Sequence, residues 1–209
     1  MDLSPLISVI INCHNGSKYL TEAIDSVINQ KYNNFEIIFW DNFSTDNSIE
    51  IIQSYNDSRI HVFQSKVFTS LGEARNLAVE EAQGKWIAFL DCDDLWSNEK
   101  LYKQIKTYNT SNIVDSIGLI YCATELIYTS DHCDIDSAWN KMLKNFNLRN
   151  SPKHLLNGKV YKDLLKRNFI PLVSALIKKD IYTELNGIDS TLTQSEDYDL
   201  FLKIANRYN

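Results

Sequence analysis

The feature that most constrains the fold is the apolar run Trp86–Leu90, which is followed at once by the acidic segment Asp91-Cys92-Asp93-Asp94. Five consecutive apolar residues are typical of a strand that is buried on both faces, as in a parallel sheet. Ligands of open α/β sheets bind beyond the carboxyl ends of the strands. Because clustered carboxylates repel one another unless a cation or hydrogen-bond donors offset their charge, the segment is a candidate site for a hard divalent metal.

The composition is that of an ordinary globular protein. The chain has 209 residues, of which 44% are hydrophobic and 23% charged, enough for one well-cored domain. A net charge of −6 disfavours nucleic-acid binding but not a nucleotide whose phosphates are carried by a metal. We find neither a signal peptide nor an apolar stretch long enough for a membrane span. We therefore expect a cytoplasmic protein, and peripheral contact with the inner face of a membrane stays open.

Strand and helix signals alternate in the first half of the chain. Short β-branched or aromatic runs predict strands at 6–11, 35–40, 60–63 and 86–90, and apolar residues at helical spacing predict helices at 18–29, 49–55 and 71–82. This alternation predicts βαβ units. The expected fold class is therefore α/β, with a mostly parallel central sheet and helices on both faces.

The second half of the chain gives weaker signals. We expect a helix at 101–108, a β-prone segment at 117–128, an irregular excursion at 129–156, a helix at 158–167, a strand at 171–177 and a last helix from about Ser195. No stretch reads as a linker, so a single domain is expected.

Polar residues follow three of the expected strands. Asn12–Asn15 follow the first, Asp41 and Asn42 the second, and the acidic segment the fourth. In a parallel sheet these ends share one rim, where one carboxylate can accept from a base or ribose and another can ligate Mg²⁺ or Mn²⁺ on a diphosphate. Taken singly, Asp41 and Asp94 are explained as turn and cap residues. Taken together, the rim residues favour a ligand site.

Two more groups could carry chemistry. Arg75 offers a planar fork for a phosphate, although a lone Arg on a helix is more often a surface residue. Ser195 is a suitable N-cap, and acids in the first turn are stabilised by the helix dipole by ~0.3–1 kcal/mol. The same dipole helps to keep Glu196 or Asp197 ionised, which a general base requires.

The order of these segments resembles that of the family 2 glycosyltransferases, which have the GT-A fold. The matching segments are Leu6–Asn15, Asp41–Asp46, Gly72–Asn76, Asp91–Asp94, which resembles the family's Asp-x-Asp motif, Asn186–Asp189 and Glu196–Leu200, which resembles its Glu-Asp motif. Each segment alone is a weak signal. The ordered set is specific and runs nearly end to end.

The resemblance implies an inverting transferase of the hexosyltransferase type. It would move a sugar from a nucleotide-diphosphate donor, expected to be a UDP-sugar, to a hydroxyl of a glycan or lipid-linked acceptor in surface polysaccharide synthesis. About 1–110 would form the donor half and about 111–209 the acceptor half of one domain over 1–209. Relatives often continue further, so part of the acceptor half is expected beyond Asn209.

The resemblance also assigns roles to residues. Asn15 would line the nucleotide pocket, Asp41 would hold the base, Asp91 would lie near the ribose, Arg75 near the nucleotide or diphosphate, Asp93 would ligate Mn²⁺ or Mg²⁺, and Asp197 would take the acceptor's proton. Asp94 would only cap the helix that follows. Three residues depart from the family pattern: Asn12 stands at a common Pro, His14 at a frequent Tyr and Phe43 at a usual small residue.

Other functions fit the sequence less well. A sugar nucleotidyltransferase would more often have a Gly-rich, Lys-containing loop after the first strand, whereas the region 12–18 has only Gly16. A non-catalytic nucleotide-sugar binding module would need no base, so the presence of Asp197 disfavours it. A Rossmann dehydrogenase is unlike this chain, because no G-x-G-x-x-G follows the first strand.

Overall fold

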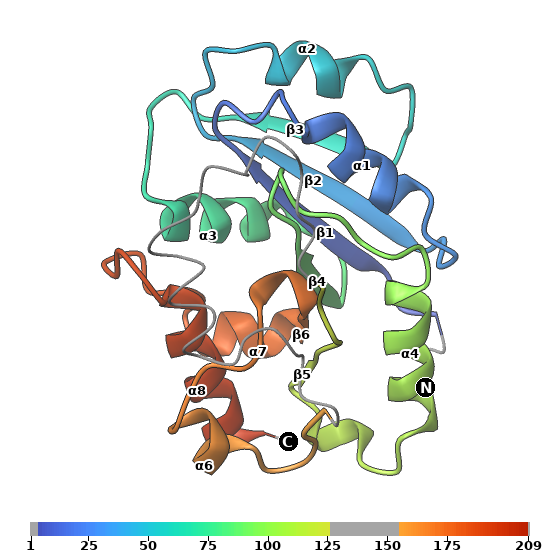
Figure 1. Ribbon diagram of the computed structural model, residues 1–209, viewed down its shortest axis with the longest axis vertical. Helices are drawn as coiled ribbons and strands as arrows, with labels where there is room; N and C mark the ends of the chain where they lie inside the picture. Colours follow the sequence, from blue (N-terminus) through green and yellow to red (C-terminus); the bar gives the residue numbers. More distant parts are fainter. Residues whose placement is uncertain (1–3, 126–154, 209) are drawn as a thin grey trace.

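Four parallel strands form the larger part of the central sheet in the computed structural model, which describes residues 4–125 and 155–208 (Figure 1). They are β1 (Ile7–Cys13), β2 (Phe35–Asp41), β3 (Ile60–Gln64) and β4 (Trp86–Phe89), and the whole sheet has the order β3-β2-β1-β4-β6-β5. All seven residues of β1, which lies between β2 and β4, are buried. The predicted mostly parallel sheet is confirmed.

The remaining two strands are short and make the sheet mixed. β6 (Leu176–Lys178) pairs antiparallel with β4, and β5 (Leu119–Ile120) pairs antiparallel with β6. β6 follows β5 in the chain but lies between β4 and β5 in the sheet. The last strands of the sheet therefore interleave segments from both sides of residues 126–154.

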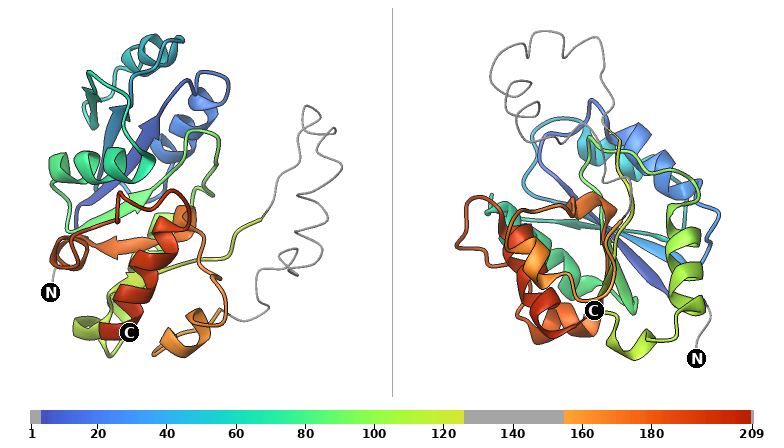
Figure 2. Two further views of the ribbon diagram at one scale, coloured as in Figure 1. Left: turned by 90° about the vertical axis from the view of Figure 1, so that its left-hand side faces the viewer. Right: turned by 60° about the horizontal axis from the view of Figure 1, so that its bottom comes forward.

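Helices cover both faces of the sheet, as predicted. α1 (Leu20–Ile28), α2 (Ser48–Gln53) and α4 (Lys100–Thr110) pack in one hydrophobic core, and α3 (Leu71–Glu81), α6 (Tyr161–Leu164), α7 (Lys179–Glu184) and α8 (Glu196–Arg207) pack in the other. In Figure 1, α4 lies to the right of the sheet and α3 and α8 to the left. Figure 2 shows α8, in red, running beside β6.

Alternation along the strands supplies both cores. Ile7, Val9 and Ile11 enter the core with α1, whereas Ile10 enters the core with α3. Each of these side chains has no exposed surface. Full burial of such a side chain stabilises a fold by roughly 1.5–3 kcal/mol, so β1 holds the two layers together.

Several predictions for the second half are corrected. The helix expected at 158–167 is the single turn α6, and the strand expected at 171–177 is a 3₁₀ turn, Leu172–Ser174, followed by β6. Pro171 lacks an N–H and suits the start of a helical turn better than a ladder. The β-prone 117–128 forms only β5 up to residue 125. Its remainder and residues 129–154 of the excursion lie outside the described part of the chain.

Candidate functional site

The ends of β1, β2 and β4 bring the predicted rim residues to one edge of the sheet. Asp41, the last residue of β2, is the register partner of Cys13, the last residue of β1. The amide of Asn42 continues the ladder by donating to the Cys13 carbonyl at 2.7 Å. Asp41 as a residue is 4% exposed, and its carboxylate accepts from the Ser44 amide at 3.2–3.3 Å. It therefore lies just below the rim.

Asn15 joins the loops after β1 and β2. Its Oδ1 accepts from the Thr45 amide at 2.7 Å and from Thr45 Oγ1 at 3.2 Å, and its own amide donates to Ser44 Oγ at 2.9 Å. Its φ of 55° lies in the left-handed region, which Asn tolerates better than most residues. The contacts made by Asn15 are thus structural, and they hold two rim loops together.

Asn42 is a rim residue for which the sequence predicts no separate role. Its Nδ2 donates to the Thr69 carbonyl at 2.9 Å, and its Oδ1 accepts from the Thr69 amide and hydroxyl at 3.2 and 3.0 Å. Asn42 therefore ties the end of β2 to the loop before α3. A buried amide directly after a strand-end Asp is the only signal that could have marked it.

The three departures from the family pattern all lie at this rim. The Asn12 Nδ2 is buried without a hydrogen-bond partner among the described residues. The His14 Nδ1 lies 2.9 Å from the Asn42 carbonyl oxygen, and its ring centroid lies 4.6 Å from that of Phe68. Phe43 has a φ of 66°, so the turn after Asp41 passes through the left-handed region at a bulky residue.

Arg75 connects three predicted segments. Its guanidinium donates through one nitrogen to Asp91 Oδ1 at 2.9 Å and through the other to Glu196 Oε1 at 2.8 Å. The residue is only 5% exposed, although it belongs to a helix. The structure thus brings α3, the end of β4 and the start of α8 together, and it identifies Arg75 as a buried bridge rather than a surface residue.

Asp197 lies in the first turn of α8. Ser195 occupies the N-cap position as predicted, but its φ of 58° is left-handed and its side chain makes no capping hydrogen bond. Asp197 Oδ1 accepts from the Tyr198 amide at 2.7 Å. Burial raises the pKa of the Asp197 carboxyl, the Tyr198 amide opposes this shift, Glu196 adds to it and Arg75 lowers it. A carboxyl with a raised pKa is better matched to general-base work near neutral pH.

The acidic segment forms a turn in which the Asp94 amide donates to the Asp91 carbonyl at 3.0 Å. The predicted cap role of Asp94 is wrong, because α4 begins only at Lys100 and has Glu99 at its N-cap. The pKa of Asp94 rises to about 6 because the carboxyl is partly buried and because Asp91 and Asp93 repel its charge. The turn therefore carries concentrated negative charge.

The same turn fits a divalent cation. Among the described residues no three Asp, Glu, His or Cys side chains form a ready-made metal site. Mg²⁺, however, is usually held by one or two carboxylates plus substrate phosphates. Asp93 is exposed and forms no hydrogen bond with the described residues, so its oxygens are open to such an ion. The donor set thus fits the Mn²⁺ or Mg²⁺ that the sequence predicts.

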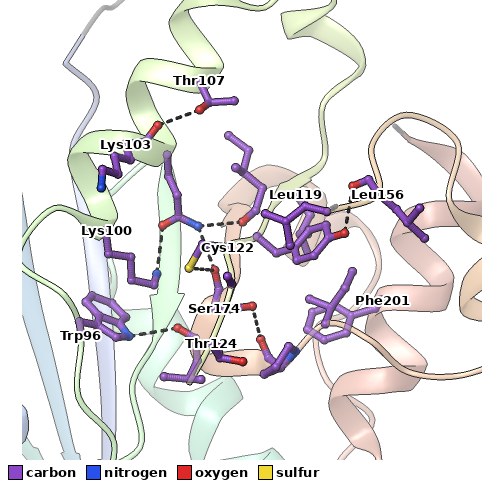
Figure 3. Close-up of a pocket in the computed structure, with 18 of the residues that line it drawn as sticks. Trp96, Lys100, Lys103, Thr107, Leu119, Cys122, Thr124, Leu156, Ser174 and Phe201 are labelled. Carbon is purple, nitrogen blue, oxygen red and sulfur yellow. Dashed lines mark hydrogen bonds between the residues drawn. The ribbon is translucent and has the colours of Figure 1, made fainter. Parts of the chain in front are cut away.

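A cavity of about 2010 Å³ extends from the acidic turn to α8 (Figure 3). Asp93 and Asp94 of the acidic turn and Phe201 of α8 are among the residues that line it. On the α4 side of the cavity, Lys100 Nζ donates to Gln104 Oε1 at 3.0 Å. It also lies 4.0 Å from the centroid of the Trp96 ring. Burial lowers the pKa of Lys100 to about 8. The cavity offers room for a further substrate beside the acidic turn.

Comparison with known sequences assigns the family. The family model described as glycosyl transferase family 2 matches residues 8–164. The chain therefore belongs to glycosyl transferase family 2. The matched part contains the strand ends, Arg75 and the acidic turn, whereas α8 lies beyond it.

Curated relatives match over most of the chain. An uncharacterized glycosyltransferase of Methanocaldococcus jannaschii is 32% identical over 210 residues, covering 98% of this chain and 66% of that protein. Escherichia coli WfgD, named as a UDP-Glc:alpha-D-GlcNAc-diphosphoundecaprenol beta-1,3-glucosyltransferase, is 29% identical over 204 residues, covering 98% and 71%. An uncharacterized glycosyltransferase of Haemophilus influenzae is 39% identical over 138 residues, covering 62% and 55%.

Solved structures share the fold. S. aureus TarS 1–349 in complex with UDP superposes with a TM-score of 0.68 at 20% identity, covering 97% of this chain and 56% of that one. The mannosyltransferase PcManGT of Pyrobaculum calidifontis, solved with GDP-Man and Mn²⁺, gives 0.70 at 18% identity, covering 98% and 53%. The GT-A fold prediction is thus confirmed, and the chain spans about half the length of several of its relatives. No helix within residues 4–125 and 155–208 is long and apolar enough to cross a membrane.

Proposed function

We propose that the chain is the donor-binding and catalytic part of an inverting glycosyltransferase. The observation that carries the proposal is the Arg75 bridge, which joins Asp91 at the end of β4 to Glu196 beside Asp197. A nucleotide-sugar bound at the strand ends would thereby have its sugar close to a carboxylate on α8. Family membership supports the same activity.

The proposed roles follow the chemistry of each side chain. Asp41 and the Asn15 loop face the nucleotide, Asp91 lies by the ribose, and Asp93 is the ligand of Mn²⁺ or Mg²⁺. Asp197 takes the proton of the acceptor hydroxyl as that oxygen attacks the sugar in a single displacement. When bound, the metal supplies Lewis-acid stabilisation of the leaving diphosphate. Arg75 orients Asp91 and leaves little of its own fork for a phosphate.

We propose a UDP-sugar as donor and a lipid-linked saccharide as acceptor, used in surface polysaccharide synthesis. TarS was solved with UDP and with UDP-GlcNAc, and WfaP and WfgD are named for UDP-Glc and a GlcNAc-diphosphoundecaprenol acceptor. Bacillus subtilis TuaG carries the name of a putative teichuronic acid biosynthesis glycosyltransferase. Such an acceptor would bring a cytoplasmic enzyme to the inner face of the membrane.

The proposal is tested by measuring binding and turnover together. Thermal shifts of the chain are recorded with UDP-glucose, UDP-GlcNAc and GDP-mannose, each with Mn²⁺ or with chelator. A ligand at a hundred times its Kd stabilises the fold by about 2.7 kcal/mol. We expect the UDP-sugars to raise Tm only with Mn²⁺. In Asp93→Ala, we expect this Mn²⁺-dependent rise in Tm to be lost. Equal shifts with chelator would contradict the metal role.

Turnover is measured as UDP release with a diphosphate-lipid saccharide as acceptor. Asp197→Asn should retain the thermal shift but lose transfer, because the amide cannot take the proton. Asp199→Asn is the matched control: Asp199 lies in the same turn but pairs with Lys203 at 2.6 Å. Transfer by Asp197→Asn at the wild-type rate would show that the base is misassigned. A donor shift without transfer by the wild type would favour the non-catalytic binding module.

A further inference from the structure

The Arg75 bridge ends on the residue that directly precedes the proposed base. Arg75 and Glu196 side chains are 6% and 14% exposed, whereas Asp91 is 44% exposed. The Glu196 end of the bridge is therefore the better shielded from solvent. Breaking a buried ion pair leaves an uncompensated charge, so this contact constrains the chain more than a surface pair does.

The start of α8 depends on such side-chain contacts because it lacks an ordinary cap. Ser195 is left-handed and its hydroxyl makes no capping bond. Instead, Glu196 is held by Arg75 from α3, and the Tyr198 hydroxyl donates to the Leu164 carbonyl of α6. Asp197 is thus flanked on both sides by anchored residues. A loss of either anchor would free the turn that carries it.

We propose that Glu196 is a positioning residue for Asp197: held by the Arg75 guanidinium, it fixes the first turn of α8 and so the place of the base. The inference rests on the proposed function, since it assigns the base to Asp197. Glu196 acts through its neighbour and takes no proton in the reaction.

Arg75 and Glu196 differ in what they hold, and this separates their effects. Arg75 contacts both Asp91 and Glu196, so its loss disturbs the donor side and the base together. Of Arg75 and Asp91, Glu196 contacts only Arg75. If Glu196 were removed, Arg75 would still donate to Asp91. Loss of Glu196 should therefore lower kcat and leave donor binding almost unchanged.

The two residues also act on Asp197 in opposite electrical senses. Glu196 raises the pKa of Asp197, and Arg75 lowers it. Asp163 of α6, which packs against α8, pairs at 2.9 Å with Lys166, just after that helix. Neutralising Glu196 should thus move the acid limb of kcat/KM to lower pH, and removing the Arg75 charge should move it to higher pH. Substitution of a residue needed only for folding would leave the acid limb of kcat/KM where it is.

The experiment compares Glu196→Gln, Glu196→Asp and Arg75→Met with the control Asp199→Asn, using the full chain and a UDP-sugar donor. We expect Glu196→Gln to lower kcat at least tenfold, to change the donor KM less than twofold and to move the acid limb to lower pH. Glu196→Asp keeps the charge on a shorter side chain, so its acid limb should stay in place while kcat falls. This variant also provides a test if Glu196→Gln does not fold.

Three outcomes would overturn the inference. An unchanged kcat in Glu196→Gln would show that the contact does not position the base. A tenfold rise in donor KM at constant kcat would make Glu196 a donor contact. In Glu196→Gln, which removes the charge, a fall in kcat with an unmoved acid limb would leave only a structural role. If Asp197→Asn itself transfers sugar normally, the proposed function fails at its base, whereas an inactive Asp197→Asn beside a normal Glu196→Gln refutes the positioning role alone.

Discussion

The two halves of the molecule build their parts of the site by different means. From β1 to β4 the side chains stand at the ends of buried parallel strands, whose ladder sets their positions. From β5 onward the strands have two or three residues, and the proposed base stands at a helix start held by an ion pair and a tyrosine. The proposed donor side is therefore fixed by backbone hydrogen bonds, and the surroundings of the proposed base by a few side chains.

The largest expected effect is on stability and contrasts the centre of the sheet with its edge. Ile10→Ala in β1 removes a fully buried side chain and should cost about 2–5 kcal/mol. Leu119→Ala in β5 removes a half-buried side chain at the sheet edge and should cost less than about 2 kcal/mol. Urea unfolding of both variants measures the difference. Equal losses would mean that the edge is as tightly packed as the centre.

Arg75→Met removes the ion pairs that join the end of β4 to the start of α8. It removes a buried cation with two carboxylate partners, which costs about 3–5 kcal/mol in fully buried pairs. Because Asp91 is 44% exposed, we expect about 2–3 kcal/mol here, together with weakened donor binding. Unfolding and UDP titration of the same variant measure both. A loss of stability with normal UDP binding would show that the bridge does not shape the donor side.

The acidic turn should make stability depend on pH. The folded pKa of Asp94, about 6, exceeds its ordinary 3.8, so the native state favours the protonated form. This carboxyl therefore costs nothing below about pH 4, and its cost grows as the pH rises to about 6. Asp94→Asn should stabilise the protein at pH 7 by about 1 kcal/mol after allowance for solvent screening. Unfolding at pH 4 and pH 7 tests this, and an equal gain at both pH values would contradict it.

The smallest effect is expected for an exposed ion pair in the second half. Asp163 and Lys166 lie 2.9 Å apart in and after α6, with side chains 44% and 73% exposed. Asp163→Asn should change stability by less than about 0.5 kcal/mol, because solvent screens such pairs. Thermal unfolding measures it. A loss comparable to that of Arg75→Met would show that the second half depends on surface charge as well as on the buried bridge.

The same contrast explains what the sequence could predict. The β-branched runs and helical spacing of the first half identify its elements, and parallel topology then puts Asp41 and Asp91 on one rim. The strand expected at 171–177 overlaps β6 only at its end, because three residues have too little pattern to set the bounds, and the antiparallel direction of β6 depends on pairing with β4. The sequence marks Arg75 as a candidate site residue but does not predict its ion pairs with Asp91 and Glu196. Its partners lie 16 and 121 positions away, and local sequence does not encode such contacts.

The interleaving of β6 between β4 and β5 has a consequence for engineering chimaeras. Residues from about 111 onward form the proposed acceptor half, and exchanging them between relatives would be the obvious way to test that assignment. Such a graft would also replace β6, whose Ile177 pairs with Ile87 of the retained β4. The graft therefore cuts through a shared sheet rather than at a boundary. A workable exchange must carry matching β4 residues with it, so the proposed acceptor half cannot be replaced without also changing the packing of the parallel strands.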